Sequence, residues 1–163
     1  MARMKAEVLE AFLDKPIVAV LAAVRKNGQP YQIPVWFLWR EGSFWLTGTY
    51  TRVWCKQLFV DPRASLCIED RDPIARYVAI DCIAEPVEPA TADIWPVSQW
   101  LAEKYMPAER VPAFMANMRT EPRLLFRLTP RHWRAIDLTV YVGSRGDLAY
   151  QQQRGGPVAL PDA

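Results

Sequence analysis

The part of the sequence best suited to bind a charged ligand lies just before the middle of the chain. A Thr47-Gly48-Thr49 segment ends a run of apolar residues, and Arg52 and Lys56 follow it at a spacing of four. Two residues four apart on a helix lie on the same face. Backbone N–H groups at a helix start, hydroxyl groups and two cations together form the type of site that binds phosphate. The segment therefore predicts an anion site.

Aromatic residues are concentrated in the strand-like segments next to this predicted anion site. They are Tyr31, Trp36, Phe37, Trp39, Phe44 and Trp45. Flat apolar walls beside an anion site suit a planar heterocycle. The same aromatic residues are also what a hydrophobic core requires, with Arg52 and Lys56 simply solvated. On residue types alone, this second interpretation is the more favoured of the two.

Other catalytic arrangements have little support in the sequence. His132 is the single histidine, which excludes a His-rich metal site and an HExxH motif. The phosphate-binding motifs GxGxxG and GxxxxGK[ST] are absent, and so is the GxSxG nucleophile motif. A net charge of +2 is too small to predict nucleic acid or an anionic membrane as the main partner. These absences point away from metal, nucleotide-loop and hydrolytic mechanisms.

The segments that must position the anion site are predicted to form an antiparallel sheet with short helices. Apolar spacing predicts helices at 4–14 and 52–60, and a helical region at 86–121 in which Pro96, Pro107 and Pro112 each stand where a helix could start. Apolar runs and alternation predict six strands, at 17–25, 30–39, 44–49, 64–70, 77–85 and 123–137. Six strands with short helices at the corners predict a mainly β, α+β fold, a six-stranded antiparallel barrel.

A length of 163 residues favours one domain. We assign it to residues 1–140, and the polar, glycine-rich residues 141–163 to a C-terminal arm. The three cysteines form no CxxC pair, so no disulfide framework is expected, and Cys67 and Cys82 are predicted to be small core residues. The N-terminus does not resemble a secretory signal, and the longest apolar run has eight residues against the roughly 20 that span a bilayer. A cytoplasmic location is expected.

The order of these segments resembles the pyridoxamine 5′-phosphate oxidase-like split-barrel superfamily. The most similar branch is the flavin and deazaflavin oxidoreductases often described as probable F420-dependent enzymes. The resemblance covers about residues 5–90, and TPRHWRAID fits the family's last strand. It is carried by the ordered segments VAVLAAVRKNGQPYQIPVWFLW, FWLTGT, TRVWCKQLFVDPRASLCIED and RYVAIDCIAEPVE. It implies an FMN-binding type of split β-barrel, a homodimer with two cofactor sites at the subunit interface, and FMN or coenzyme F420 as the redox group.

The resemblance also implies which residues bind the cofactor. The family's second-strand segment, which would lie along the isoalloxazine ring, matches Ile33, Pro34, Val35 and Trp36. The end of the third strand matches Thr47, Gly48 and Thr49. The family's basic segment matches Arg52, Lys56, Leu58, Asp61, Pro62 and Arg63.

The chain departs from the family pattern at two positions of this basic segment. Trp54 stands where the family usually has a phosphate-binding lysine, and Gln57 stands where it usually has asparagine. An indole cannot replace an ammonium as a phosphate partner, although it can stack on a ring or fill the site.

Two functions follow from the resemblance and its departure. The first is an oxidoreductase that transfers a hydride between bound FMN or F420 and a small organic substrate. No side-chain acid or base is assigned to it, because the cofactor performs the redox step. The second is a non-catalytic dimeric binding protein for a flavin, a haem or another planar ligand. Trp54 in place of the lysine favours this second function.

Overall fold

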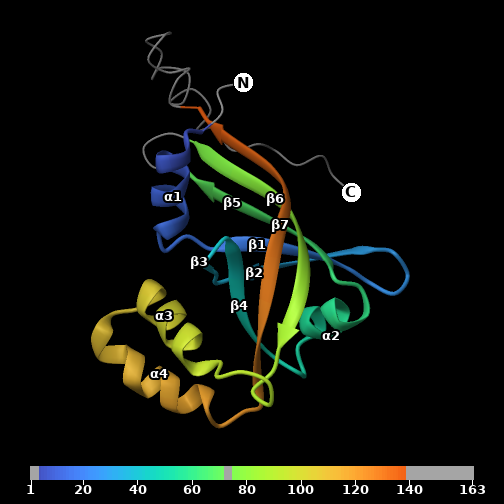
Figure 1. The fold of residues 1–163 in the computed structure, drawn as a ribbon, viewed down its shortest axis with the longest axis vertical. Coiled ribbons are helices and arrows are strands. Elements are labelled where there is room, and N and C mark those ends of the chain that lie inside the picture. The colour runs from blue at the N-terminus through green and yellow to red at the C-terminus, as the bar shows by residue number, and fades with distance from the viewer. Residues whose placement is uncertain (1–3, 72–74, 139–163) are drawn as a thin grey trace, which may run out of the picture.

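The protein is built around one antiparallel β-sheet, seen in a computed structural model that describes residues 4–71 and 75–138. The strand order is β2-β1-β5-β6-β7-β4-β3. The strands are β1 (Ala19–Val24), β2 (Pro30–Val35), β3 (Leu38–Arg40), β4 (Ser43–Thr49), β5 (Arg63–Asp70), β6 (Arg76–Val87) and β7 (Arg123–Asp137). The long strands β6 and β7 join the two halves of the sheet (Figure 1). The C-terminal arm predicted at 141–163 lies outside the described residues.

In the part of the chain that the structure describes, the sheet is accompanied by the α-helices α1 (Ala6–Asp14), α2 (Val53–Val60), α3 (Trp95–Tyr105) and α4 (Val111–Met118), and by the short 3-10 helix η1 (Ala108–Arg110). The helices α3 and α4 form a hairpin at the opposite end of the molecule from α1's first turn, and α2 connects β4 to β5 (Figure 1). Pro96 and Pro112 lie in the first turns of α3 and α4, where proline's missing N–H costs nothing. Among the described residues, no helix has both the length and the apolar character needed to cross a membrane.

The predicted strand at 30–39 is in fact two strands, β2 and β3, so residues 4–71 and 75–138 form seven strands rather than the six predicted. The backbone N–H of Phe37 donates to the hydroxyl of Tyr105 at 3.1 Å, and that hydroxyl donates to the carbonyl of Ile17 at 2.8 Å. Because a side chain of α3 satisfies the backbone at the break, no neighbouring strand is needed there. β2 and β3 end the described sheet on its two sides, so it is an open sheet rather than the closed six-stranded barrel predicted.

Apart from a small cluster between α3 and α4, the core is formed mainly by side chains of the sheet, α1 and α2. Its largest fully buried side chains include Phe12, Phe37, Phe44, Trp54, Leu66 and Phe126. Cys82 is buried as predicted, but the prediction for Cys67 is wrong, since its side chain is exposed. Side chains alternate between the two faces of a strand, and Cys67 lies between the buried residues Leu66 and Ile68.

The bridging hydroxyl of Tyr105 gives a test of how the helical hairpin is attached. Tyr105→Phe is expected to lower the free energy of unfolding by about 1–3 kcal/mol, because it leaves the partly buried backbone groups of Phe37 and Ile17 without their partner. Urea unfolding measures the change. Tyr77→Phe is the matched control, because the Tyr77 hydroxyl makes no hydrogen bond within the described ranges, and it should cost less than about 0.5 kcal/mol. Equal losses in the two variants would contradict this role of Tyr105.

Candidate functional site

A pocket of about 280 Å³ opens beside the first turn of α2. It is formed where the end of β2, the strand β4, the start of α2, the helix α4 and the start of β7 meet. Its lining residues are Pro34, Val35, Trp36, Thr47, Arg52, Trp54, Phe114 and Arg123. We call it the cofactor pocket, because six of the residues assigned to a cofactor from the sequence lie in its wall.

The other predicted site residues lie outside this wall. Ile33 packs against the hydrophobic core. Thr49 is 5% exposed, and its hydroxyl shares a hydrogen bond of 2.9 Å with that of Thr51. Gly48 lies under Trp54, where an added Cβ would be 2.4 Å from the Sγ of Cys55 and 3.0 Å from the indole. Only glycine therefore allows α2 to lie this close to β4.

Arg52 and Lys56 line different pockets. Arg52 is the N-cap of α2 and has an extended backbone, with φ −68° and ψ 138°. Because an N-cap lies outside the helical turns, the rule that residues four apart share a face does not apply to this pair. The structure thus places Arg52 with Trp54 in the cofactor pocket and Lys56 on another side of α2.

Arg123 is the cation that the sequence alone did not reveal. It is paired in register with Thr49, and this pairing brings it close to Arg52 at the end of the sheet. Its side chain is 12% exposed, its Nε donates to the carbonyl of Met118 at 3.3 Å, and its Nη2 is 3.6 Å from a carboxylate oxygen of Glu121. Burial lowers the pKa of Arg123, and the positive charge of Arg52 lowers it further, against the opposing effect of Glu121. Arg52 is exposed whereas the Arg123 side chain is largely buried, and two guanidinium groups lining one pocket favour an anion between them.

Two buried polar atoms in the wall of the cofactor pocket lack a partner. Neither Oγ1 of Thr47 nor Nε1 of Trp54 has a hydrogen-bond acceptor or donor among the described residues. Such atoms are rare, because leaving a buried donor unpaired costs about 1–3 kcal/mol. The oxygens of a phosphate group accept hydrogen bonds from a hydroxyl and from an indole N–H. The wall therefore fits an oxyanion.

Aromatic rings form one side of the cofactor pocket. Trp36 stacks on Tyr105 with ring centroids 4.8 Å apart and planes within 3°, and the Phe114 ring lies 5.8 Å from that of Trp36. Trp54 is 1% exposed, and its ring lies 5.5 Å from that of Phe126. The hairpin of α3 and α4 thus holds Trp36 as a flat wall, while Trp54 is mainly a core residue with one edge in the pocket.

The described lining of the cofactor pocket includes no cysteine, and the thiol of Cys55, the residue after Trp54, is not activated. Burial raises the pKa of the Cys55 thiol to about 12, against the smaller opposing effects of the Thr49 backbone and of Arg52 and Arg123. A thiol with this pKa stays protonated near neutral pH and is a poor nucleophile. The described groups are suited to binding an anion and a flat ring rather than to covalent catalysis.

Sequence comparison places this architecture in a known family. A family model described as pyridoxamine 5′-phosphate oxidase matches residues 6–137. The chain belongs to the pyridoxamine 5′-phosphate oxidase family. This match confirms the resemblance inferred from the ordered segments. A comparison with curated proteins finds no match.

Several solved structures share the fold of this family member. A conserved hypothetical protein from Mycobacterium tuberculosis superposes with a TM-score of 0.69, at 23% identity over 98% of this chain and 93% of its own. An F420 reductase gives a TM-score of 0.60, at 22% identity over 77% of this chain and 94% of its own. HutZ, described as a haem storage protein from Vibrio cholerae, gives 0.64, at 18% identity over 82% of this chain and 94% of its own. At these identities the likeness establishes the fold alone.

The burial of Trp54 leads to a prediction about the missing lysine. Trp54→Lys is expected to lower the free energy of unfolding by about 3–5 kcal/mol, because a large buried ring is lost and an ammonium takes its place. It is not expected to tighten FMN binding. Urea unfolding and FMN titration of the same variant measure both effects, and Trp54→Phe, which keeps an aromatic ring in the space, should cost less. Tighter FMN binding by Trp54→Lys at unchanged stability would contradict this prediction, because it would show that position 54 can place a cation beside the phosphate.

Proposed function

We propose that this protein is an oxidoreductase that binds FMN or coenzyme F420 in the cofactor pocket. The observation that carries the proposal is the pair Arg52, which is exposed, and Arg123, which is largely buried. Both line one pocket together with the unpartnered atoms of Thr47 and Trp54. FMN carries a phosphate and F420 a phosphodiester, so each matches a pocket built for an oxyanion. When bound, the ring of either cofactor supplies two-electron redox chemistry with a small organic substrate.

The residues of the cofactor pocket contribute different interactions to the proposed binding. The planar guanidinium groups of Arg52 and Arg123 would hold the phosphate and could bind it in a bidentate manner, which an ammonium cannot do. Oγ1 of Thr47 and Nε1 of Trp54 would donate to phosphate oxygens. Trp36, held by its stacking on Tyr105, forms an apolar wall that keeps water from the ring. In this proposal Arg123 supplies the charge that the family usually places at the position of Trp54.

We also propose a homodimer in which a second copy completes each site. A volume of about 280 Å³ is below the roughly 300–1,000 Å³ typical of small-molecule sites, so a bound cofactor needs a further wall. Val18 and Val20 are 44% and 39% exposed on or beside the outer face of β1. Apolar side chains exposed on a strand face are typical of a protein interface. The edge strand β2 borders both the pocket and this face.

A second candidate function is the non-catalytic binding of haem or another planar ligand. A cavity of about 530 Å³ is formed on the sheet by apolar residues such as Ala22, Val24 and Ile83, with Arg131 and His132 among its lining residues. A neutral imidazole is a ligand for haem iron, and an arginine pairs with carboxylates such as the haem propionates. Asp81 lies opposite His132 in the strand register, where a carboxylate could orient the imidazole.

Titration of the purified protein with FMN, F420 and haemin separates the two candidate functions. Saturable binding of FMN or F420, with a flavin band near ~450 nm or a deazaflavin band near ~420 nm, supports the oxidoreductase. Binding of haemin alone, with a shifted Soret band that is lost in His132→Ala, supports the non-catalytic binding protein instead. A cytoplasmic location stays a prediction.

Substitution of the two arginines tests the phosphate assignment. Arg52→Ala and Arg123→Gln should each weaken FMN affinity about tenfold or more, because a hydrogen bond to a charged group contributes roughly 1.5–3 kcal/mol. Riboflavin, which has the same ring without the phosphate, should bind the wild type and both variants about equally. Flavin fluorescence measures both affinities. Lys56→Ala is the matched control and should change FMN affinity less than about twofold, because Lys56 lies in another pocket. Equal losses for riboflavin and FMN would mean that the arginines support the fold rather than the phosphate.

The proposed homodimer makes a prediction about assembly. The wild-type protein should sediment as a dimer at micromolar concentration, with an interface on the order of 2,000 Å² or more. Val20→Glu should shift it toward the monomer, because an unpaired carboxylate would be buried in the interface. Ala11→Glu, which adds the same charge on the exposed side of α1, is the control and should leave the dimer intact. A stable monomer of the wild type would contradict both the dimer and the shared sites.

A further inference from the structure

A second pocket, of about 360 Å³, lies between α2 and the hairpin that joins β1 to β2. We call it the hairpin pocket. Figure 1 shows the hairpin and α2 on the same side of the molecule, away from α3 and α4. Among the described residues, the hairpin pocket shares no lining residue with the cofactor pocket. It is therefore a separate cavity that the proposed redox function does not use.

Three cations line the hairpin pocket: Arg25, Lys26 and Lys56. Within residues 4–71 and 75–138, none of the three forms an ion pair with a carboxylate. The Arg25 guanidinium lies over the Tyr31 ring, 4.9 Å from its centroid, which holds it beside the hairpin. The lining contains no described acidic residue, so the hairpin pocket carries a local excess of positive charge.

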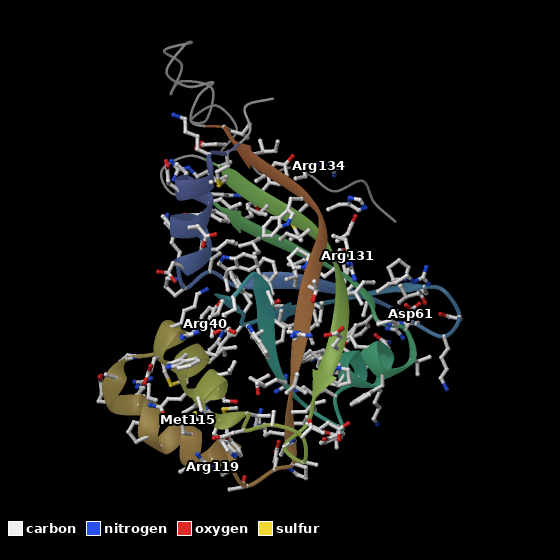
Figure 2. The ribbon with its side chains drawn as sticks, in the orientation of Figure 1. Arg40, Asp61, Met115, Arg119, Arg131 and Arg134 are labelled. Atoms are coloured by element: carbon white, nitrogen blue, oxygen red, sulfur yellow. The ribbon has the colours of Figure 1, made fainter. Side chains whose placement is uncertain are left out.

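Asp61, which follows α2 near the hairpin (Figure 2), does not neutralise these cations. Its carboxylate is held by Arg63, with Nη2 to Oδ2 at 2.6 Å and Nε to Oδ1 at 2.9 Å. This pairing lowers the pKa of Asp61 to about 2. The acidic group therefore stays engaged with Arg63, and the charge of the hairpin pocket remains available to an anion.

The rest of the lining restricts the kind of anion. Val53 and Val60 are 49% and 60% exposed, and with Val24 they give the hairpin pocket an apolar surface that an apolar ligand would cover. Oε1 of Gln57 is buried and accepts no hydrogen bond from any described residue. This buried amide oxygen needs a hydrogen-bond donor, and a carboxylate or phosphate anion carries no N–H or O–H group to donate.

We propose that the hairpin pocket binds an organic anion that has a flat apolar body and a hydroxyl or amino donor, such as a hydroxylated aromatic carboxylate. The carboxylate pairs with Arg25, Lys26 and Lys56, the body covers the valines, and the donor bonds to Oε1 of Gln57. Binding there is independent of FMN or F420 because α2 separates the two pockets. The proposal does not depend on the redox function.

Titration of the native protein with 6-hydroxy-2-naphthoate tests whether the cations of the hairpin pocket bind the carboxylate of such a ligand. Saturable binding is expected, and the double variant Arg25→Gln/Lys56→Gln should weaken it at least tenfold. The control Lys5→Gln/Arg110→Gln removes the same charge from exposed positions outside the pocket and should leave affinity unchanged. Absence of saturable binding to the native protein, or equal losses in the two double variants, would overturn the proposal.

Two further measurements define the donor and the independence of the site. Gln57→Leu should weaken 6-hydroxy-2-naphthoate but leave 2-naphthoate, which lacks the hydroxyl, unchanged. Saturating FMN should not displace the probe, and one-for-one displacement by FMN would overturn the proposal. FMN affinity is measured on the same variants, so that failure of the hairpin pocket and failure of the cofactor pocket are seen separately.

Discussion

The close packing of α2 on β4 at Gly48 is the contact on which both pockets depend. A Cβ at this position would lie 2.4 Å from the Sγ of Cys55, so any larger residue would push the helix away from the sheet. With α2 in place, the indole of Trp54 packs over Gly48 and against Phe126, and the N-cap Arg52 comes beside Arg123. Another side of the same helix brings Lys56 to the β1–β2 hairpin. One short helix thus divides two basic cavities.

The position of Trp54 shows how burial decides where a charge can be placed. An ammonium there would be almost completely desolvated, since Trp54 is 1% exposed, and no described carboxylate lies in the pocket to pair with it. The positive charge of Arg123 instead enters from the start of β7, where its side chain keeps 12% exposure and a bond to the Met118 carbonyl. The indole keeps the core packed while the guanidinium supplies the charge.

The hairpin of α3 and α4 controls the shape of the cofactor pocket from the opposite side. Tyr105 bridges the backbone of Phe37 and Ile17, and its ring supports Trp36. The neighbouring Lys104 donates to the carbonyl of Leu13 at 2.7 Å and lies 3.7 Å from the centroid of the Phe37 ring. Burial lowers the pKa of Lys104 to about 8, against the opposing effect of Asp14. These contacts fix the aromatic wall by tying it to α1 and to the start of β1.

The sequence by itself determined the features that depend on neighbours along the chain. Apolar periodicity predicted α1 and α2, and the six strands appeared close to their predicted bounds, with only 30–39 divided. The helical region predicted at 86–121 contains α3 and α4, but it starts too early, because β6 continues to Val87 and the first helix begins at Trp95. Short ordered segments identified the family and brought Pro34, Trp36, Thr47 and Arg52 into one predicted site. The alternation of buried and exposed side chains along β5 is also visible in the sequence. Extended to Cys67, this alternation predicts the exposed side chain that the structure shows.

Only the tertiary structure decided what depends on residues far apart in the sequence. The break after β2 requires Tyr105, 68 residues beyond Phe37, and Arg123 reaches Arg52 only because β7 pairs with β4. The separation of Arg52 from Lys56 follows from the extended N-cap that begins α2, a geometry that a spacing of four does not reveal. Periodicity is set by the dihedral angles of successive residues, whereas these contacts are set by which surfaces the packed chain brings together.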